Sequence, residues 1–128
     1  MRTSFRKRGK KSAGVSKQHC GTTGQLENCQ VGVFLAYVSR LGHTLVDREL
    51  YLPLRWTLDR ERCREAGIPE EVRFQTKCEQ ARQMIERLWK AKIPFCWVVA
   101  DSRLRREWGS AKLAGSAPVL LRLGGGLR

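Results

Sequence analysis

The 128-residue sequence lacks any apolar run that approaches the roughly 18 residues of a membrane span. Its basic N-terminus is not followed by an apolar segment, so it does not have the form of a secretory signal. It has five cysteines, an odd number, and no C-x-x-C pair. This pattern predicts free thiols in a reducing compartment rather than a disulfide framework. These absences predict a cytoplasmic protein with no membrane partner.

Acidic residues are also scarce, because only 12 Asp and Glu stand against 25 Lys and Arg. The resulting net charge of +13 predicts a polyanionic partner, of which nucleic acid is the usual one. The glycine-containing stretch at residues 21–24 has no lysine in the register of a phosphate-binding loop. The sequence therefore predicts no nucleotide cradle and no small-molecule substrate.

Positive charge is concentrated in residues 2–17, which form a basic leader. Two interpretations of this leader are open. It is either a solvated tail or an arm that contacts phosphates, whose binding would weaken steeply as the salt concentration rises. The candidate nucleic-acid-binding residues are Arg6, Lys7, Arg8, Lys10, Lys11 and Lys17.

Two strands are predicted in the first half of the chain. Residues 31–38 are rich in β-branched and aromatic side chains, which indicates a buried strand. Residues 41–43 form a turn, and residues 44–52 continue as a more polar strand nearer an edge of the sheet. Asp47, Arg48 and Glu49 are expected to include an ion pair on this second strand rather than a catalytic group.

Two helices are predicted next. The first covers residues 57–66, with Thr57 as its N-cap and Gly67 at its end. The second begins at Thr76, because Thr76 and Glu79 match a capping box. The apolar face of the second helix predicts core packing and consists of Cys78, Ala81, Ile85 and Leu88, with Met84 beside them.

A continuous apolar run at residues 93–101, IPFCWVVAD, predicts a strand that is buried on both faces and ends on Asp101. Two interpretations of Asp101 are open at this point. It is either the first residue of the next loop, or a metal ligand or catalytic group at the edge of the sheet. A hairpin, two helices and a returning strand together predict an α/β fold, a mixed sheet with flanking helices.

Several longer motifs occur in the same order along the chain. They include GTTGQLENCQVGVF at residues 21–34, DRELYLP at residues 47–53 and FQTK at residues 74–77. These motifs resemble those of bacterial insertion-sequence transposases of the DDE type, and the resemblance covers roughly residues 3–101. It implies a partial RNase H-like fold, and an activity in DNA cleavage and strand transfer during transposition.

The resemblance also implies a metal site. In DDE transposases three carboxylates hold two Mg²⁺ ions, because hard oxygen ligands suit this cation, and the ions activate the attacking oxygen and stabilise the leaving one. By this resemblance Asp101 is the second of the three carboxylates, and so a catalytic metal ligand.

The chain departs from the family pattern at two places. The stretch that matches the family's first catalytic Asp is MRTSFRKRG, so that position falls on Met1, and the first central strand of the sheet is expected to be missing. After Asp101 the family continues with a pattern like Asp-Thr-Val-Tyr-Gly-Gly, whereas residues 102–128 are basic and then Gly-rich. Codons can be chosen for residues 103–110 so that a one-base shift restores Val-Tyr-Gly-Gly. The tail is therefore interpreted as frameshifted, with the catalytic Glu beyond the end of this chain.

These features predict a transposase fragment with a basic leader at residues 1–17, a partial catalytic core at residues 18–101 and a non-family tail at residues 102–128. We expect it to be inactive, since one carboxylate of three cannot hold two Mg²⁺ ions. We also expect it to be poorly stable, since open strand edges favour aggregation. The implied partners are DNA, at insertion-sequence ends, and an intact transposase. The alternative is a small basic protein that binds nucleic acid without catalysis.

Overall fold

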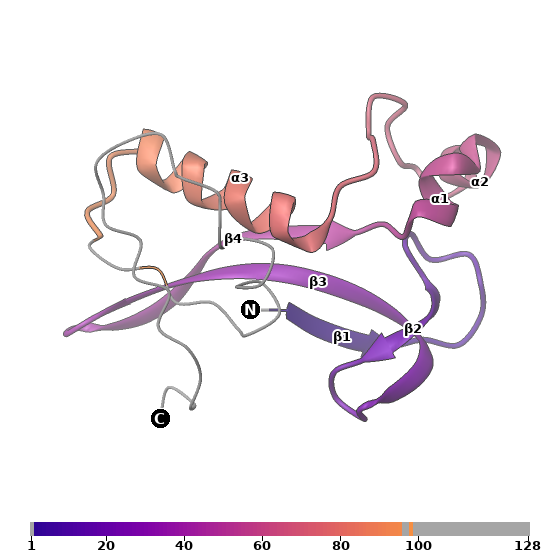
Figure 1. Cartoon of the computed structure of the whole chain (residues 1–128), viewed down its shortest axis with the longest axis horizontal. Coiled ribbons are helices and arrows are strands. Elements are labelled where there is room, and N and C mark those ends of the chain that lie inside the picture. The colour runs from indigo at the N-terminus through magenta and orange to yellow at the C-terminus, as the bar shows by residue number, and fades with distance from the viewer. Residues whose placement is uncertain (1, 96–97, 99–128) are drawn as a thin grey trace.

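The computed structural model describes residues 2–95 and 98. The strands in this part of the chain form one antiparallel sheet around the long strand β3 (Gln25–Ser39). On one side of β3, β1 (Arg2–Arg6) pairs with residues 29–33. On the other side, β2 (Ser16–Cys20) pairs with residues 25–29 and β4 (Gly42–Tyr51) pairs with residues 31–39. Figure 1 shows β3 running through the middle of the molecule.

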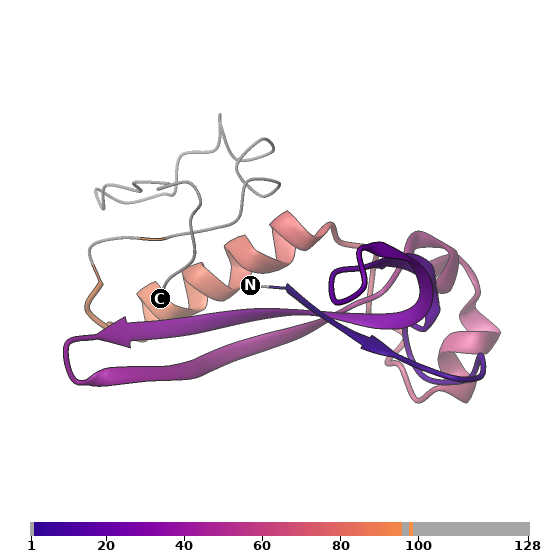
Figure 2. The ribbon, with the colours of Figure 1, turned by 90° about the horizontal axis from the view of Figure 1, so that it is seen from below.

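The longest helix, α3 (Lys77–Lys90), lies across one face of the hairpin formed by β3 and β4 (Figures 1 and 2). It begins at the capping box that the sequence predicts. The Thr76 hydroxyl accepts a hydrogen bond from the Glu79 N–H (3.2 Å), and the Glu79 carboxylate accepts one from the Thr76 N–H (2.7 Å). These two bonds satisfy backbone donors that would otherwise have no partner at the start of the helix.

The face that α3 turns to the sheet is close to the predicted one. Cys78, Met84 and Ile85 are buried, whereas Ala81 and Leu88 are only partly buried. One polar side chain is buried with them. Gln80 of α3 is buried against the sheet, and its side-chain amide donates a hydrogen bond to the Leu50 carbonyl of β4 (3.0 Å).

The prediction of one helix over residues 57–66 is wrong, because the structure has two short helices there, α1 (Leu54–Leu58) and α2 (Arg60–Glu65). Asp59 separates them with a non-helical backbone, and its carboxylate accepts a hydrogen bond from the Arg62 N–H (3.1 Å) as the N-cap of α2. Thr57 is not an N-cap. It is buried inside α1, where its hydroxyl donates to the Leu54 carbonyl (2.9 Å).

The sequence did not predict β1 or β2, both of which begin within residues 2–17. β1 has the sequence RTSFR, in which Phe5 is the one apolar residue. It therefore lacks the apolar alternation by which a strand is recognised in a sequence. The hairpin turn lies at residues 40–41, slightly before the predicted turn. The predicted strand at residues 93–101 falls mostly outside the described residues, as do Met1, Asp101 and residues 102–128.

Some of the buried side chains form two clusters. The first packs α1 and α2 against the segment before β2 and contains Val15, Trp56 and Cys63. The second lies inside the ribbon of β2 and β3 and contains Cys20, Cys29 and Val31, with the partly buried Tyr51 packed against it. In the described part of the chain, no helix has the length and apolar character needed to cross a membrane.

Candidate nucleic-acid interface

The predicted basic residues lie on one loop and on the strands beside it. Residues 7–11, which we call the basic loop, follow β1 and are all exposed. Arg6 is the last residue of β1, and Lys17 lies on β2. Lys17 pairs with Asn28 of β3, and the Lys7 N–H donates a hydrogen bond to the Asn28 carbonyl (3.0 Å). Asn28 therefore lies between the basic loop and β2.

The Asn28 side chain fixes the shape of the basic loop. Its amide Nδ2 donates to the Lys7 carbonyl (2.9 Å) and to the Gly9 carbonyl (2.8 Å). Between these two contacts the backbone turns through Gly9, whose φ of +89° suits glycine and few other residues. The basic loop is therefore built onto the sheet and is not a solvated tail.

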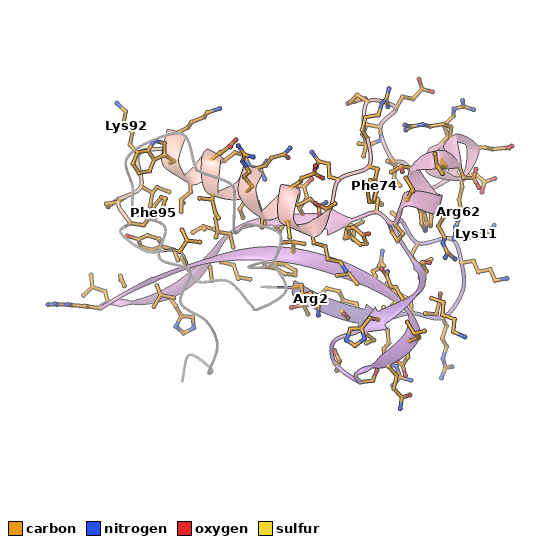
Figure 3. The ribbon with its side chains drawn as sticks, viewed as in Figure 1. Arg2, Lys11, Arg62, Phe74, Lys92 and Phe95 are labelled. Carbon is orange, nitrogen blue, oxygen red and sulfur yellow. The ribbon has the colours of Figure 1, made fainter. Side chains whose placement is uncertain are left out.

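Arg62 of α2 holds the other end of the basic loop. Its guanidinium Nη2 donates to the Lys10 carbonyl (2.8 Å), and the same group lies 3.8 Å from the centroid of the Trp56 ring. The Trp56 indole N–H donates in turn to the Val15 carbonyl (2.7 Å). Figure 3 shows Arg62 and Lys11 beside one another, and both line one open depression. The hydrogen bond from Arg62 thus joins α2 to the basic loop, the cation–π contact joins α2 to α1, and the indole hydrogen bond joins α1 to the segment before β2.

The two depressions beside the basic loop contain different numbers of carboxylates. Lys10, Lys11 and Arg62 share their depression with three carboxylates, those of Asp59, Glu61 and Glu65. Lys7 and Arg8 line a second depression of about 480 Å³, where the acidic residue is Glu27. Glu27 already forms an ion pair with Arg6 (2.8 Å). An added anion therefore meets less repulsion at Lys7 and Arg8 than at Lys10 and Lys11.

Sequence reasoning identified the charges of this surface but missed the residues that position them. Asn28 lies inside a motif used for the resemblance, and nothing in that motif shows that its side chain serves the basic loop. Arg62 and Lys10 are 52 positions apart, so no local pattern could connect them. Only the packing of α2 against the segment before β2 brings them together.

The two carboxylates of β4 are held by Arg87 of α3. The Arg87 Nε lies 2.9 Å from Asp47 Oδ2, and its Nη2 lies 3.5 Å from Glu49 Oε2. The prediction of an ion pair among Asp47, Arg48 and Glu49 is therefore wrong, because the cation that pairs with the two carboxylates is Arg87 of α3. Arg48 contributes its backbone N–H, which donates to Asp47 Oδ1 (2.8 Å).

This arrangement shifts two pKa values. Burial alone would raise the pKa of Asp47, but the hydrogen bond and charge of Arg87, with the Arg48 N–H, lower it below its ordinary value. The hydrogen bond to Asp47 raises the pKa of Arg87. Because the pKa of Asp47 is lower in the folded state than in the unfolded state, the pair stabilises the fold above the ordinary pKa of Asp. That stabilisation is lost as the pH falls through the folded value.

We therefore expect Asp47→Asn to lower the free energy of unfolding at pH 7 and to lower it less at pH 3, where part of the stabilisation is already lost. The expected loss is below about 1 kcal/mol, because the Arg87 side chain is half exposed and water screens the pair. Urea unfolding at both pH values measures the difference. Glu71→Gln, which removes an exposed carboxylate elsewhere, is the control. An equal loss at pH 3 and pH 7 would show that the charge of the Asp47 carboxylate does not stabilise the fold.

The described carboxylates do not fit a pair of divalent metal ions. Within residues 2–95 no group of three or more His, Cys, Asp or Glu side chains is arranged to hold a metal. The carboxylates of Asp47 and Glu49 share Arg87 as their cation, and those of Asp59, Glu61 and Glu65 share their depression with Lys10, Lys11 and Arg62. Asp101, the predicted metal ligand, lies outside the described residues.

Comparison with known protein families identifies the chain. The family model of the DDE superfamily endonucleases matches residues 2–104, which is most of the sequence. This chain belongs to that family. As a DDE superfamily member it has a partial RNase H-like fold, and the family acts on DNA and generally uses divalent metal ions. No curated protein and no solved structure gives a significant match.

Proposed function

We propose that this chain is a DDE transposase fragment that binds the DNA backbone through the basic loop, with Arg6 and Lys17, and does not itself cleave DNA. The observation that carries the proposal is the anchoring of the loop by Asn28 and Arg62. These contacts use backbone carbonyls, so they leave the basic side chains of the loop exposed for phosphates. The net charge of +13 supports the same polyanionic partner.

The absence of cleavage is proposed from the identity of the residues. The position that resembles the family's first catalytic Asp is occupied by Met1, and a thioether is a poor ligand for Mg²⁺. The described carboxylates add no replacement, because Asp47 and Glu49 are bound by Arg87. Asp101 would supply one of the three carboxylates that hold two metal ions in this family.

A salt titration of DNA binding tests the first half of the proposal. We expect the association constant for a labelled duplex, measured by fluorescence anisotropy, to fall steeply as the salt concentration rises. The triple variant Lys7→Gln, Arg8→Gln, Lys10→Gln should weaken binding and reduce the slope of log K against log salt by up to about 2.7, at about 0.9 for each phosphate that is no longer neutralised. The three backbone anchors of the loop are retained.

The matched control removes the same charge from the opposite end of the molecule. The residues of this control are Arg40, Lys90 and Lys92, each changed to Gln; Lys90 and Lys92 border α3 and Arg40 lies in the hairpin turn. If general charge alone determined binding, both triple variants would lower the slope equally. That equality, or a slope unchanged by the first variant, would overturn the assignment to the basic loop.

Plasmid nicking tests the second half. The chain, incubated with supercoiled DNA and MgCl₂, should leave the DNA uncut under conditions in which it binds. Nicking that disappears in Asp101→Ala would show that the chain is catalytic. Nicking that persists in that variant would indicate a contaminating nuclease, and a further purified sample would then have to leave the plasmid intact for the proposal to stand.

A further inference from the structure

Two cysteines with no role in the proposed DNA contacts lie together inside the curled ribbon of β2 and β3. Cys20 ends β2, Cys29 lies on β3, and both are 0% exposed in one cluster. In a flat ladder they would be well apart, because Cys20 pairs with Gln25 and Cys29 pairs with Ser16. Figure 2 shows the curl of this ribbon, and both cysteines belong to one buried cluster. The curl is deep enough for the Gly21 N–H to reach the Ser4 hydroxyl of β1 (3.0 Å).

The two thiols lie in the same buried cluster and have different surroundings. Burial raises the pKa of Cys20, but hydrogen bonds from the backbone and side chains of Thr23 and Thr22 outweigh it and lower the pKa below its ordinary value. Burial, the Cys20 charge and the hydrogen bond to Cys20 raise the pKa of Cys29. Glu27 raises it further and Lys77 lowers it. Cys20 is thus the more acidic of the two thiols, and a more acidic thiol is the more readily ionised nucleophile.

We propose that Cys20 and Cys29 form a redox-active dithiol, which a hydroperoxide converts into an intramolecular disulfide. This inference rests on the burial of both cysteines in one cluster and on the position of Cys20 at the turn of residues 21–24, where its carbonyl accepts a hydrogen bond from the Gly24 N–H (2.8 Å). It is independent of DNA binding. The turn is exposed, so a small oxidant reaches Cys20 when residues 21–24 open away from β1.

The chemistry proceeds in two steps. The Cys20 thiolate attacks the peroxide, so that an S–O bond forms while the O–O bond breaks, and hydroxide leaves and is protonated to water. The Cys29 sulfur then attacks the sulfenic sulfur of Cys20. An S–S bond forms, the S–O bond breaks, and the departing hydroxide takes the Cys29 proton to give a second water. The two thiols lose two electrons and two protons, and hydrogen peroxide is reduced to two molecules of water.

The sequence makes the test simple, because trypsin releases residues 18–40 as one peptide that contains Cys20 and Cys29 and no other cysteine. The folded wild-type chain is treated with hydrogen peroxide, its remaining thiols are alkylated, and the chain is digested with trypsin. The masses of the peptides are then measured by mass spectrometry. We expect the peptide to escape alkylation and to be about 2 Da lighter than its reduced form, with recovery after dithiothreitol. The free thiols should fall from five to three.

Two comparisons make the result specific. The same treatment in concentrated urea should form this disulfide more slowly, because the Thr22 and Thr23 hydrogen bonds and the thiol contact are absent there. Cys20→Ser should retain all four remaining free thiols, whereas Cys29→Ser should form a sulfenic acid at Cys20 and no disulfide. The wild-type digest covers the case in which a variant does not fold. Bonds to Cys63, Cys78 or Cys96, or sulfinic acid at Cys20 with no disulfide, would overturn the proposal.

Discussion

Trp56→Ala is expected to lower the free energy of unfolding by about 3–5 kcal/mol, the largest effect of any single substitution that the structure suggests. Trp56 is 0% exposed and is among the largest side chains of the core. Its removal leaves a cavity between α1 and the segment before β2, and also leaves the Val15 carbonyl without its indole partner. A typical domain has only about 5–15 kcal/mol of stability, so much of the population is expected to unfold.

Equilibrium unfolding in urea measures this effect, with Trp56→Phe as the conservative variant. Phenylalanine retains an aromatic ring against Cys63 and Arg62 and loses the indole N–H, so its loss should be clearly smaller. Tertiary structure at zero urea should be followed by near-UV circular dichroism. A loss below about 1 kcal/mol in Trp56→Ala would mean that the first core cluster contributes little to folding, contrary to its burial.

Gly14→Ala is expected to cost about 2–5 kcal/mol, for two separate reasons. Gly14 has a φ of +76°, which an L-residue with a side chain rarely adopts. A Cβ at this position would also lie 2.8 Å from the Tyr51 carbonyl oxygen and 3.3 Å from Leu52 Cδ2. The first of these neighbours is backbone, so it cannot turn aside as the end of a side chain can.

Gly9→Ala separates the two reasons. Gly9 has a similar φ of +89°, but a Cβ there meets nothing within 4 Å. It should therefore show only the conformational cost, roughly 1–2 kcal/mol, reduced by the lower entropy of the unfolded chain. The difference between the two variants in thermal or urea unfolding measures the close approach of Gly14 to the end of β4. Equal losses would show that this contact relaxes freely.

Parts of this fold could be predicted because their causes are local. The capping box at Thr76 and Glu79 depends on two residues three positions apart, and it is present in the structure. The turn at residues 21–24 and the core of β3 depend on glycine content and on a short apolar pattern. In each case the relevant contacts are made within one stretch of sequence.

Other parts could not be predicted because they depend on distant partners. The break at Asp59 is stabilised by the packing of Trp56 against Val15 and by the contact of Arg62 with Lys10, neither of which a helix pattern reveals. The burial of Gln80 depends on a carbonyl of β4, and the ion pair of Asp47 depends on a helix 40 positions away. The sequence shows that the basic loop is charged, but the hydrogen bonds that fix its shape come from the Asn28 side chain of β3.

The hydrogen bond from Gln80 to the Leu50 carbonyl has a consequence for how this molecule meets its neighbours. Within the described residues β4 pairs only with β3, so it borders the sheet. A border strand can act as a template on which an extended segment of another molecule adds itself. At Leu50 the acceptor that such a segment would need is already taken by an amide from α3. The helix therefore blocks lateral growth of the sheet at this position through a single side chain.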